Sequence, residues 1–163
     1  MGNIVLIGMP AVGKSTIGVL LAKTLILSFT DMDLLIQEKY KKSLCDIIND
    51  NGTKAFLNIE EDVILNSDFH NSVIATGGSA VYGENAMKKL KASGKVIYLD
   101  LSLEEIRKRI GDIKSRGVVL TKGTTLEDIF NDRKALYEKY ADIKIDCNNL
   151  TAEECVEKII SVL

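Results

Sequence analysis

Short apolar runs rich in β-branched residues alternate with segments of helical periodicity along this chain of 163 residues. The apolar runs predict five strands, at 3–7, 27–30, 72–76, 95–99 and 143–146. Because helical patterns separate all five, the expected fold class is α/β, a three-layer, doubly wound parallel sheet with helices on both faces. The length predicts a single domain over 1–163.

Helix starts are marked by hydroxyl residues that precede an acidic residue by three positions. Ser102 with Glu105 and Thr151 with Glu154 predict capping boxes, and Thr125 with Asp128 is a weaker relative of that pattern. Since ligands of doubly wound sheets bind outside the carboxyl ends of the strands, candidate chemistry is expected directly after each strand.

The segment Gly8-Met9-Pro10-Ala11-Val12-Gly13-Lys14-Ser15-Thr16 follows the first predicted strand and fits G-x-x-x-x-G-K-[ST]. In such a loop backbone N–H groups surround phosphate oxygens, Lys14 reaches the β- and γ-phosphates, and the Ser15 hydroxyl binds Mg²⁺. The helix that begins there adds the positive end of its dipole. The pattern predicts a nucleoside triphosphate site, and we assign to it Gly8, Ala11, Gly13, Lys14, Ser15 and Thr16.

Two carboxylates, Asp31 and Asp33, follow the second predicted strand. Mg²⁺ takes few protein carboxylates, so we assign Asp31 to the metal beside Ser15. We assign Asp33 to the hydroxyl of a phosphoryl acceptor, as an orienting group or base. An acidic helix start would also explain both residues, and the two explanations are compatible.

Three further features carry weaker signals. The segment 111–125 contains three glycines among charged and hydroxyl residues, and we expect it to be an active-site lid that brings Arg116 to the phosphates. The paired glycines Gly77 and Gly78 let backbone approach a ligand closely. Arg109 and Arg133 are not assigned a role by their spacing alone.

Composition narrows the class of partner. Lys and Arg number 21 against 23 Asp and Glu, and the positive residues are scattered, so no nucleic-acid partner is expected. The three cysteines form no C-x-x-C pair, which argues against a zinc site. No apolar run is long enough to span a membrane. We therefore expect a cytoplasmic protein that binds ATP and a small-molecule acceptor.

The order of these motifs resembles the shikimate kinase family over nearly the whole chain. The likeness is carried by the phosphate loop, by Phe29-Thr30-Asp31-Met32-Asp33, by Thr76-Gly77-Gly78 and by the segment from Arg133 to Asp142. It implies a fold of the nucleoside-monophosphate-kinase type, a place in aromatic amino acid biosynthesis, and transfer of the ATP γ-phosphate to shikimate with Mg²⁺.

The resemblance also implies roles for individual residues. Lys14 and Arg116 would neutralise phosphates, Asp33 would bind substrate hydroxyls, Arg109 would lie against adenine, and Arg133 would pair with the substrate carboxylate. The turn at Gly77 and Gly78 would line an acceptor site whose helical region covers about 33–66. A lid-closing kinase of this size needs no partner subunit, so a monomer is expected.

The chain departs from the family pattern mainly on the acceptor side. In Phe56-Leu57-Asn58-Ile59-Glu60, Leu57 stands where the family has a second arginine for the substrate carboxylate. Ser79 replaces the third glycine of the turn, Gly117 follows Arg116 where a proline is usual, and Ala135 replaces a second proline. Leu57 and Ser79 are therefore counted with the acceptor-binding positions, and Lys54 is a possible substitute cation.

Three functions are consistent with these residues. The first is phosphorylation of shikimate, which Asp33 and Arg133 favour. The second is phosphorylation of another hydroxylated metabolite, such as a sugar acid, a polyol or an amino alcohol. The third is a nucleotide switch without catalysis, which has no need of the carboxylates and arginines retained here.

Overall fold

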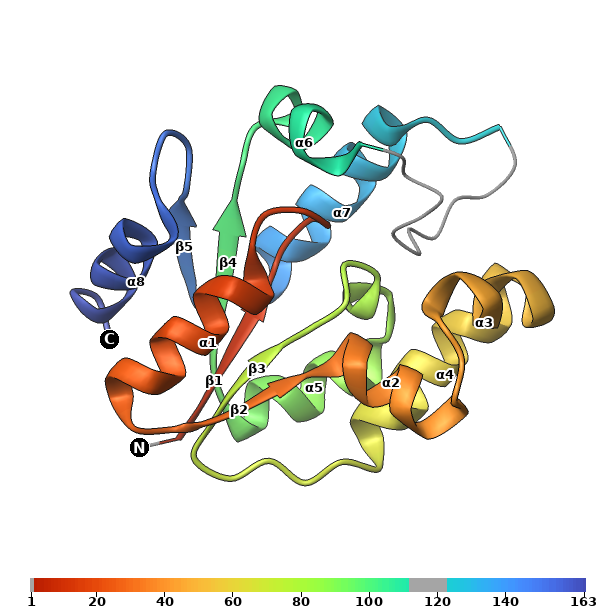
Figure 1. The fold of residues 1–163 in the computed structure, drawn as a ribbon, viewed down its shortest axis with the longest axis horizontal. Helices are drawn as coiled ribbons and strands as arrows, with labels where there is room; N and C mark the ends of the chain where they lie inside the picture. The colour runs from red at the N-terminus through yellow and green to blue at the C-terminus, as the bar shows by residue number, and fades with distance from the viewer. Residues whose placement is uncertain (1, 112–122) are drawn as a thin grey trace.

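The computed structural model describes residues 2–111 and 123–163. Its centre is a five-stranded parallel sheet in the order β2-β3-β1-β4-β5 (Figure 1). The strands are β1 (Asn3–Ile7), β2 (Ser28–Asp31), β3 (Ser72–Ala75), β4 (Gly94–Asp100) and β5 (Ile143–Asp146). The fold class predicted from the sequence is confirmed.

Eight α-helices and one 3-10 helix occur in the described ranges. They are α1 (Lys14–Leu25), α2 (Met32–Tyr40), α3 (Leu44–Asn51), α4 (Thr53–Leu65), η1 (Ala80–Tyr82), α5 (Glu84–Ser93), α6 (Leu103–Ile110), α7 (Leu126–Tyr140) and α8 (Ala152–Ile160). α1 and α8 pack together over one face of the sheet, while α5 and α7 cover the other (Figure 1). α2, α3 and α4 form a group beside the β2 end of the sheet.

The burial of the strands explains why their sequences read as continuous apolar runs. All five residues of β1 and all four of β3 are buried, because helices cover both faces of the sheet at these strands. The edge strands β2 and β5 are more exposed. The predicted bounds of β1 and β5 match the structure, and those of the other three strands differ by one residue at the ends.

The predicted helix caps are confirmed at two positions and corrected at a third. Thr125 and Thr151 form reciprocal capping boxes with Asp128 and Glu154. At the start of α6 the Ser102 hydroxyl accepts from the Glu105 backbone N–H at 3.3 Å, as a cap should.

The second bond of the predicted Ser102 capping box, from the Ser102 backbone N–H to the Glu105 carboxylate, is wrong. The Ser102 backbone N–H donates to Asn148 Oδ1 at 3.0 Å instead, and the Glu105 carboxylate pairs with Lys108 at 3.0 Å. A side chain from the loop after β5 therefore takes the place that a local residue was expected to fill.

Because all five strands are parallel, the segments that follow β1, β2 and β3 emerge at the same edge of the sheet. They carry the phosphate loop, the pair of aspartates and the paired glycines. The helical region predicted over 33–66 corresponds to most of α2 together with α3 and α4. Of the segment proposed as a lid, residues 112–122 lie outside the described residues.

Within the described ranges, no helix is both long enough and apolar enough to cross a membrane.

Candidate active site

The phosphate loop ends in a helix start that is open to an anion. Within the described residues no side chain caps α1, whose N-cap is Gly13, and its first turn holds no acidic residue. Ser43 caps α3, and Thr125 and Thr151 cap α7 and α8, whereas α4 and α5 also begin without a side-chain cap. Backbone N–H groups at an uncapped helix start bind phosphate oxygens readily, and the helix dipole favours the negative charge.

Lys14 lies over this loop and is held by its backbone. The ammonium donates to the carbonyl oxygen of Gly8 at 2.7 Å and to that of Met9 at 2.9 Å. The side chain is almost entirely buried, and burial lowers its pKa to about 8, with Arg133 contributing and the nearby carboxylates opposing the shift. The positive charge on Lys14 is therefore only partly stabilised by the protein and gains from phosphate oxygens.

This shift predicts that nucleotide binding takes up protons in mildly alkaline solution. Phosphates favour the charged lysine and raise its pKa above about 8, so ADP affinity should fall as pH rises from 8 toward 9.5. Calorimetry at pH 8.5 in buffers of different ionisation enthalpy should show net proton uptake when ADP binds. In Lys14→Met the binding is expected to be weaker and this proton uptake to be absent; equal uptake in both proteins would contradict the assignment to Lys14.

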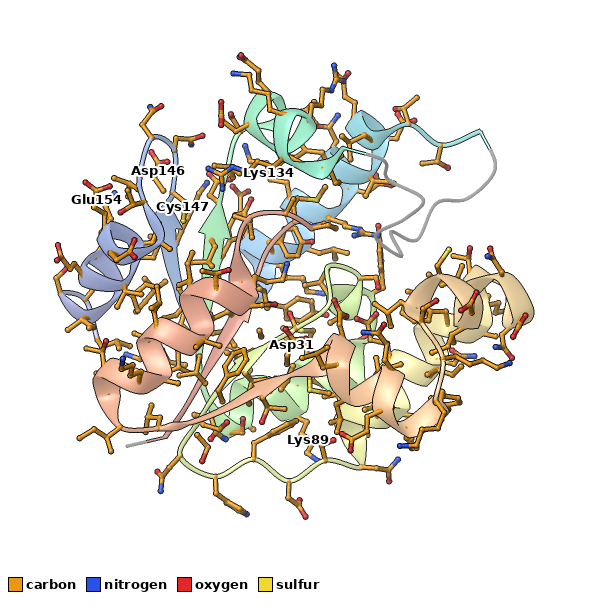
Figure 2. All side chains as sticks on the ribbon, viewed as in Figure 1. Asp31, Lys89, Lys134, Asp146, Cys147 and Glu154 are labelled. Carbon is orange, nitrogen blue, oxygen red and sulfur yellow. The ribbon has the colours of Figure 1, made fainter. Side chains whose placement is uncertain are left out.

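Ser15 and Asp31 meet directly beside the loop. The Ser15 hydroxyl donates to Asp31 Oδ2 at 2.5 Å, while Asp31 Oδ1 accepts from the backbone N–H groups of Asp33 and Leu34. Asp31 thus also caps α2, and Figure 2 shows it at the end of β2, directly before α2. The geometry is therefore compatible with both explanations of Asp31 from the sequence, a ligand of Mg²⁺ beside Ser15 and an acidic residue at a helix start.

A hydroxyl beside a single carboxylate fits Mg²⁺, which usually keeps several waters and binds substrate phosphates as well. The described residues contain no group of three or more acidic, histidine or cysteine side chains that could hold a metal alone.

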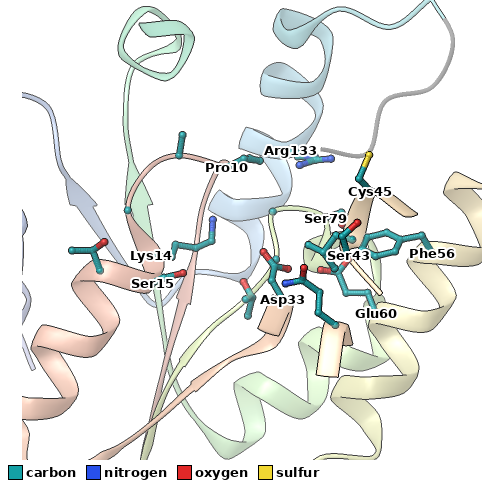
Figure 3. Close-up of a pocket in the computed structure, with 18 residues that line it drawn as sticks. Pro10, Lys14, Ser15, Asp33, Ser43, Cys45, Phe56, Glu60, Ser79 and Arg133 are labelled. Atoms are coloured by element: carbon teal, nitrogen blue, oxygen red, sulfur yellow. The ribbon is translucent and has the colours of Figure 1, made fainter. Parts of the chain in front are cut away.

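A cavity of about 580 Å³ opens between the phosphate loop and the helices α2 to α4 (Figure 3). It brings together ten of the predicted functional positions: Ala11, Gly13, Lys14, Ser15, Thr16, Asp33, Gly77, Gly78, Ser79 and Arg133. The sequence analysis did not assign Gln37, Ser43, Cys45, Phe56 or Glu60, which also line it. Phe56 and Glu60 are four apart on α4, and this spacing was the available signal that they share a helix face.

Arg133 enters the cavity from α7 on the far side of the sheet. It is 1% exposed, and its guanidinium lies 5.5 Å from the centre of the Tyr82 ring. The backbone of Gly78 passes so close that a β-carbon there would lie 2.9 Å from an Arg133 nitrogen and 2.8 Å from Pro10. Tyr137 fixes this turn by donating its hydroxyl to the Gly78 carbonyl at 2.6 Å. The paired glycines thus allow a buried cation to reach the cavity.

Two carboxylates in the cavity are poorly solvated. Burial raises the pKa of Asp33, although Lys14 opposes the shift. Burial also raises the pKa of Glu60 to about 7, against the effect of a hydrogen bond from Ser79. Perturbed carboxylates beside two buried cations are typical of sites that act on polar ligands.

A second cavity, of about 200 Å³, lies on the other side of the loop. Its lining is largely apolar, and Arg109 is the charged residue among the described residues that form it. Cys147 and Cys155 are buried, form no disulfide and are part of this lining. Figure 2 shows Cys147 just after β5, beside α8. Gly13 and Thr16 line both cavities.

Four of the predicted positions that the structure describes are not among the residues that line the larger cavity: Gly8, Asp31, Leu57 and Arg109. Leu57 is half-buried on α4 but is not one of the described residues that line it. Arg116 lies outside the described residues. Lys54, the possible substitute cation, is exposed and likewise is not one of the described residues in that lining.

Comparisons with known proteins agree on one family. The family model for shikimate kinase matches residues 10–163. A shikimate kinase of Alkaliphilus oremlandii is 37% identical over 166 residues, which cover 97% of this chain and 96% of that protein.

Solved structures agree as well. The shikimate kinase of Acinetobacter baumannii, in complex with shikimate, superimposes with a TM-score of 0.91 at 30% identity, over 99% of this chain and 92% of that one. The shikimate kinase of Aquifex aeolicus gives a TM-score of 0.83 at 32% identity, over 98% and 94% of the two chains.

Proposed function

Because this chain belongs to the shikimate kinase family, whose members transfer a phosphoryl group from ATP to an alcohol, we propose that it phosphorylates a ring hydroxyl of shikimate to give shikimate 3-phosphate. The observation that supports this best is the larger cavity. It holds Lys14 and the open start of α1 together with Asp33 and Arg133, so a triphosphate and a hydroxylated carboxylic acid can be bound side by side.

The donor half follows from the phosphate loop. ATP would place its phosphates against the α1 start and Lys14, and its base in the smaller apolar cavity, where Arg109 can lie against an aromatic ring. Ser15 and Asp31 would hold Mg²⁺, which when bound neutralises charge on the phosphates. Arg116, in the proposed lid, would add a further cation.

The acceptor half follows from the residues across the cavity. Asp33 would orient the reacting hydroxyl and accept its proton, and Arg133 would pair with the carboxylate of shikimate. Transfer then depends mainly on positioning and on neutralisation of the phosphates, which are the main contributions in enzymes of this class.

A coupled assay of ADP release tests the proposal. Shikimate should stimulate release strongly, with the product identified as shikimate 3-phosphate by phosphorus NMR. Quinate, gluconate, homoserine and simple polyols serve as competing acceptors. Release without any acceptor, together with capture of a protein partner, would favour a nucleotide switch instead.

One observation favours a second candidate, a kinase of another hydroxylated metabolite. Arg133 is the only arginine among the described residues that line the cavity, and Leu57 stands where the family has a second one. An acceptor whose carboxylate needs only one arginine, or an acceptor without a carboxylate, would lose less binding free energy at this site. A higher kcat/KM for gluconate or a polyol than for shikimate would establish this alternative.

Leu57→Arg is expected to raise kcat/KM for shikimate by about 10- to 100-fold, because a charge-assisted bond to a carboxylate contributes roughly 1.5–3 kcal/mol. Leu57 is half-buried and is not one of the described residues packed against the core, so the change should cost little stability. Steady-state kinetics should show a lower KM. Leu57→Met, similar in size and uncharged, is the control; no gain over it would show that the site needs no second arginine.

We also infer that the protein acts as a cytoplasmic monomer. A kinase of this size that closes its own lid needs no partner subunit to complete the site, and the three cysteines form no disulfide, which is compatible with a reducing compartment. Light scattering at the concentration of the kinetic assay measures the oligomeric state, and a dimer whose dissociation abolishes activity would overturn the inference.

A further inference from the structure

The hydroxyl of Tyr137, on α7, lies where the phosphate loop, the paired-glycine turn and Arg133 meet. The side chain is fully buried. The hydroxyl donates to the Gly78 carbonyl at 2.6 Å, and its oxygen lies 3.9 Å from Met9 Sδ. Arg133, one helical turn earlier on α7, forms a hydrogen bond with the same hydroxyl. One oxygen atom therefore contacts the phosphate loop, the turn after β3 and the buried cation of the larger cavity.

The directions of the two hydrogen bonds are fixed by their chemistry. A phenol has a single proton, and Tyr137 donates it to the Gly78 carbonyl. A guanidinium only donates, so the bond to Arg133 runs from an arginine N–H to the phenol oxygen. Burial raises the pKa of Tyr137, although the charge and the hydrogen bond of Arg133 oppose the shift. The phenol therefore stays protonated at neutral pH, and donation of its proton strengthens the oxygen as an acceptor.

Other groups limit where the guanidinium of Arg133 can lie. Figure 3 shows it beside Pro10, and a β-carbon on Gly78 would lie 2.8 Å from Pro10 and 2.9 Å from an Arg133 nitrogen. The centre of the Tyr82 ring is 5.5 Å from the guanidinium carbon. Close packing and a ring face restrict the position of a guanidinium, whereas a directed hydrogen bond also fixes its orientation.

Lys14 exerts a force that opposes this arrangement. The positive charge of Arg133 lowers the pKa of Lys14, so the two cations that line the larger cavity are close enough to repel each other. The hydrogen bond to the buried Tyr137 opposes displacement of Arg133 by this repulsion. A guanidinium carries five N–H donors, so one that is bound to a phenol can also bind a carboxylate.

We propose that Tyr137 is a positioning residue for acceptor binding: its hydroxyl holds the Arg133 guanidinium in the orientation that pairs with the acceptor carboxylate. The inference rests on the proposed function, in which Arg133 pairs with the carboxylate of shikimate, and extends it to a residue behind the cavity wall. Tyr137 is not one of the described residues that line the cavity, so its effect reaches the acceptor through Arg133. The sequence analysis assigned Tyr137 no role.

Tyr137→Phe tests the inference because it removes the hydroxyl and keeps the ring, which stacks on Tyr98 with ring centres 5.1 Å apart. Steady-state kinetics are measured with shikimate and ATP. We expect KM for shikimate to rise by about 10-fold, because a hydrogen bond to a charged group is lost. KM for ATP and kcat should change little, since every group assigned to ATP or to the reacting hydroxyl is retained.

Tyr98→Phe is the matched control. Tyr98 is the other buried tyrosine of the stacked pair, and its hydroxyl donates to Asp100 Oδ1 at 2.8 Å, so this variant loses a comparable bond away from the cavity. Thermal unfolding should show a similar loss of stability in both variants, while KM for shikimate should rise only in Tyr137→Phe. An unchanged KM in Tyr137→Phe, or an equal rise in both variants, would overturn the positioning role.

Arg133→Met, similar in length and uncharged, tests whether Tyr137 acts through Arg133. Measurement of kcat/KM at subsaturating shikimate allows weak binding to be compared among the variants. Arg133→Met alone should lower kcat/KM for shikimate by about 10- to 100-fold, and addition of Tyr137→Phe should cause no further loss. Additive losses would show that Tyr137 acts independently of Arg133, and the inference would be wrong.

The outcomes for the variants are distinct from those for the proposed function. ADP release that shikimate stimulates in the wild-type protein supports the kinase function whatever the variants show. A normal kcat/KM in Arg133→Met would show that this arginine does not bind the acceptor, so the inference would fail while the function stands. If the wild-type protein releases no ADP with shikimate, the proposed function fails, and the inference that rests on it fails as well.

Discussion

Replacing Lys14 with alanine is expected to lower kcat by about 10³-fold, the largest loss of any single change at this site. The lysine ammonium is buried at the phosphate loop and is held by the carbonyls of Gly8 and Met9, so it is already positioned where negative charge develops during transfer. No other cation among the described residues is held by the loop backbone in this way. Phosphoryl transfer measured at saturating ATP isolates this effect from weaker nucleotide binding.

Lys23→Ala, an exposed change on the same helix α1, is the control and should leave kcat unchanged. Thermal unfolding of both variants checks that the fold is intact. The loss of Lys14 removes a desolvated charge, so a large drop in stability is not expected. Near-normal turnover by Lys14→Ala at saturating ATP would mean that another group neutralises the phosphates, and the mechanism above would be wrong.

The second large effect is expected at Asp33. Asp33→Asn should lower kcat by about 10²- to 10⁴-fold, because an amide cannot accept the proton of the reacting hydroxyl. KM for ATP should change less than kcat, since no residue of the phosphate loop is replaced, although Lys14 loses the nearby carboxylate that most supports its charge. Burial raises the pKa of Asp33, so the neutral asparagine should be tolerated by the fold or even stabilise it.

Asp68→Asn, at an exposed position between α4 and β3, is the matched control for this change. Single-turnover measurements of phosphoryl transfer distinguish chemistry from product release. A variant at Asp33 that loses acceptor affinity but keeps its single-turnover rate would show that Asp33 binds the hydroxyl without accepting its proton.

The centre of the sheet was predictable because its strands are almost entirely apolar. Strands buried on both faces by helices show no alternation, and the β1 and β3 sequences have this character. The phosphate loop was predictable for another reason: its chemistry is contained in nine consecutive residues, so no tertiary contact is needed to recognise it. The Ser102 cap was only half predictable, because its second partner is Asn148, distant in the sequence.

The acceptor-binding part of the site depends on packing between elements that are distant in the sequence, so it was harder to predict. Glu60 reaches the cavity because α4 lies beside η1, which follows the turn that carries Ser79, and nothing near Glu60 in the sequence indicates this contact. Leu57 is not one of the described residues that line the cavity, but on α4 it lies between Phe56 and Glu60, which do, so a longer side chain at this position is expected to reach the ligand and its role stays a prediction. The role of Arg116 stays a prediction.

Gly13 and Thr16 form part of the wall of both cavities, so one short stretch of backbone would contact ATP in the smaller cavity and also line the cavity that receives the acceptor. A shift of that stretch when one site fills must change the other. Any such change is reciprocal: if nucleotide tightens acceptor binding by a given factor, the acceptor tightens nucleotide binding by the same factor. The order in which the two substrates arrive would then affect the rate of assembly but not the affinity of the complete ternary complex.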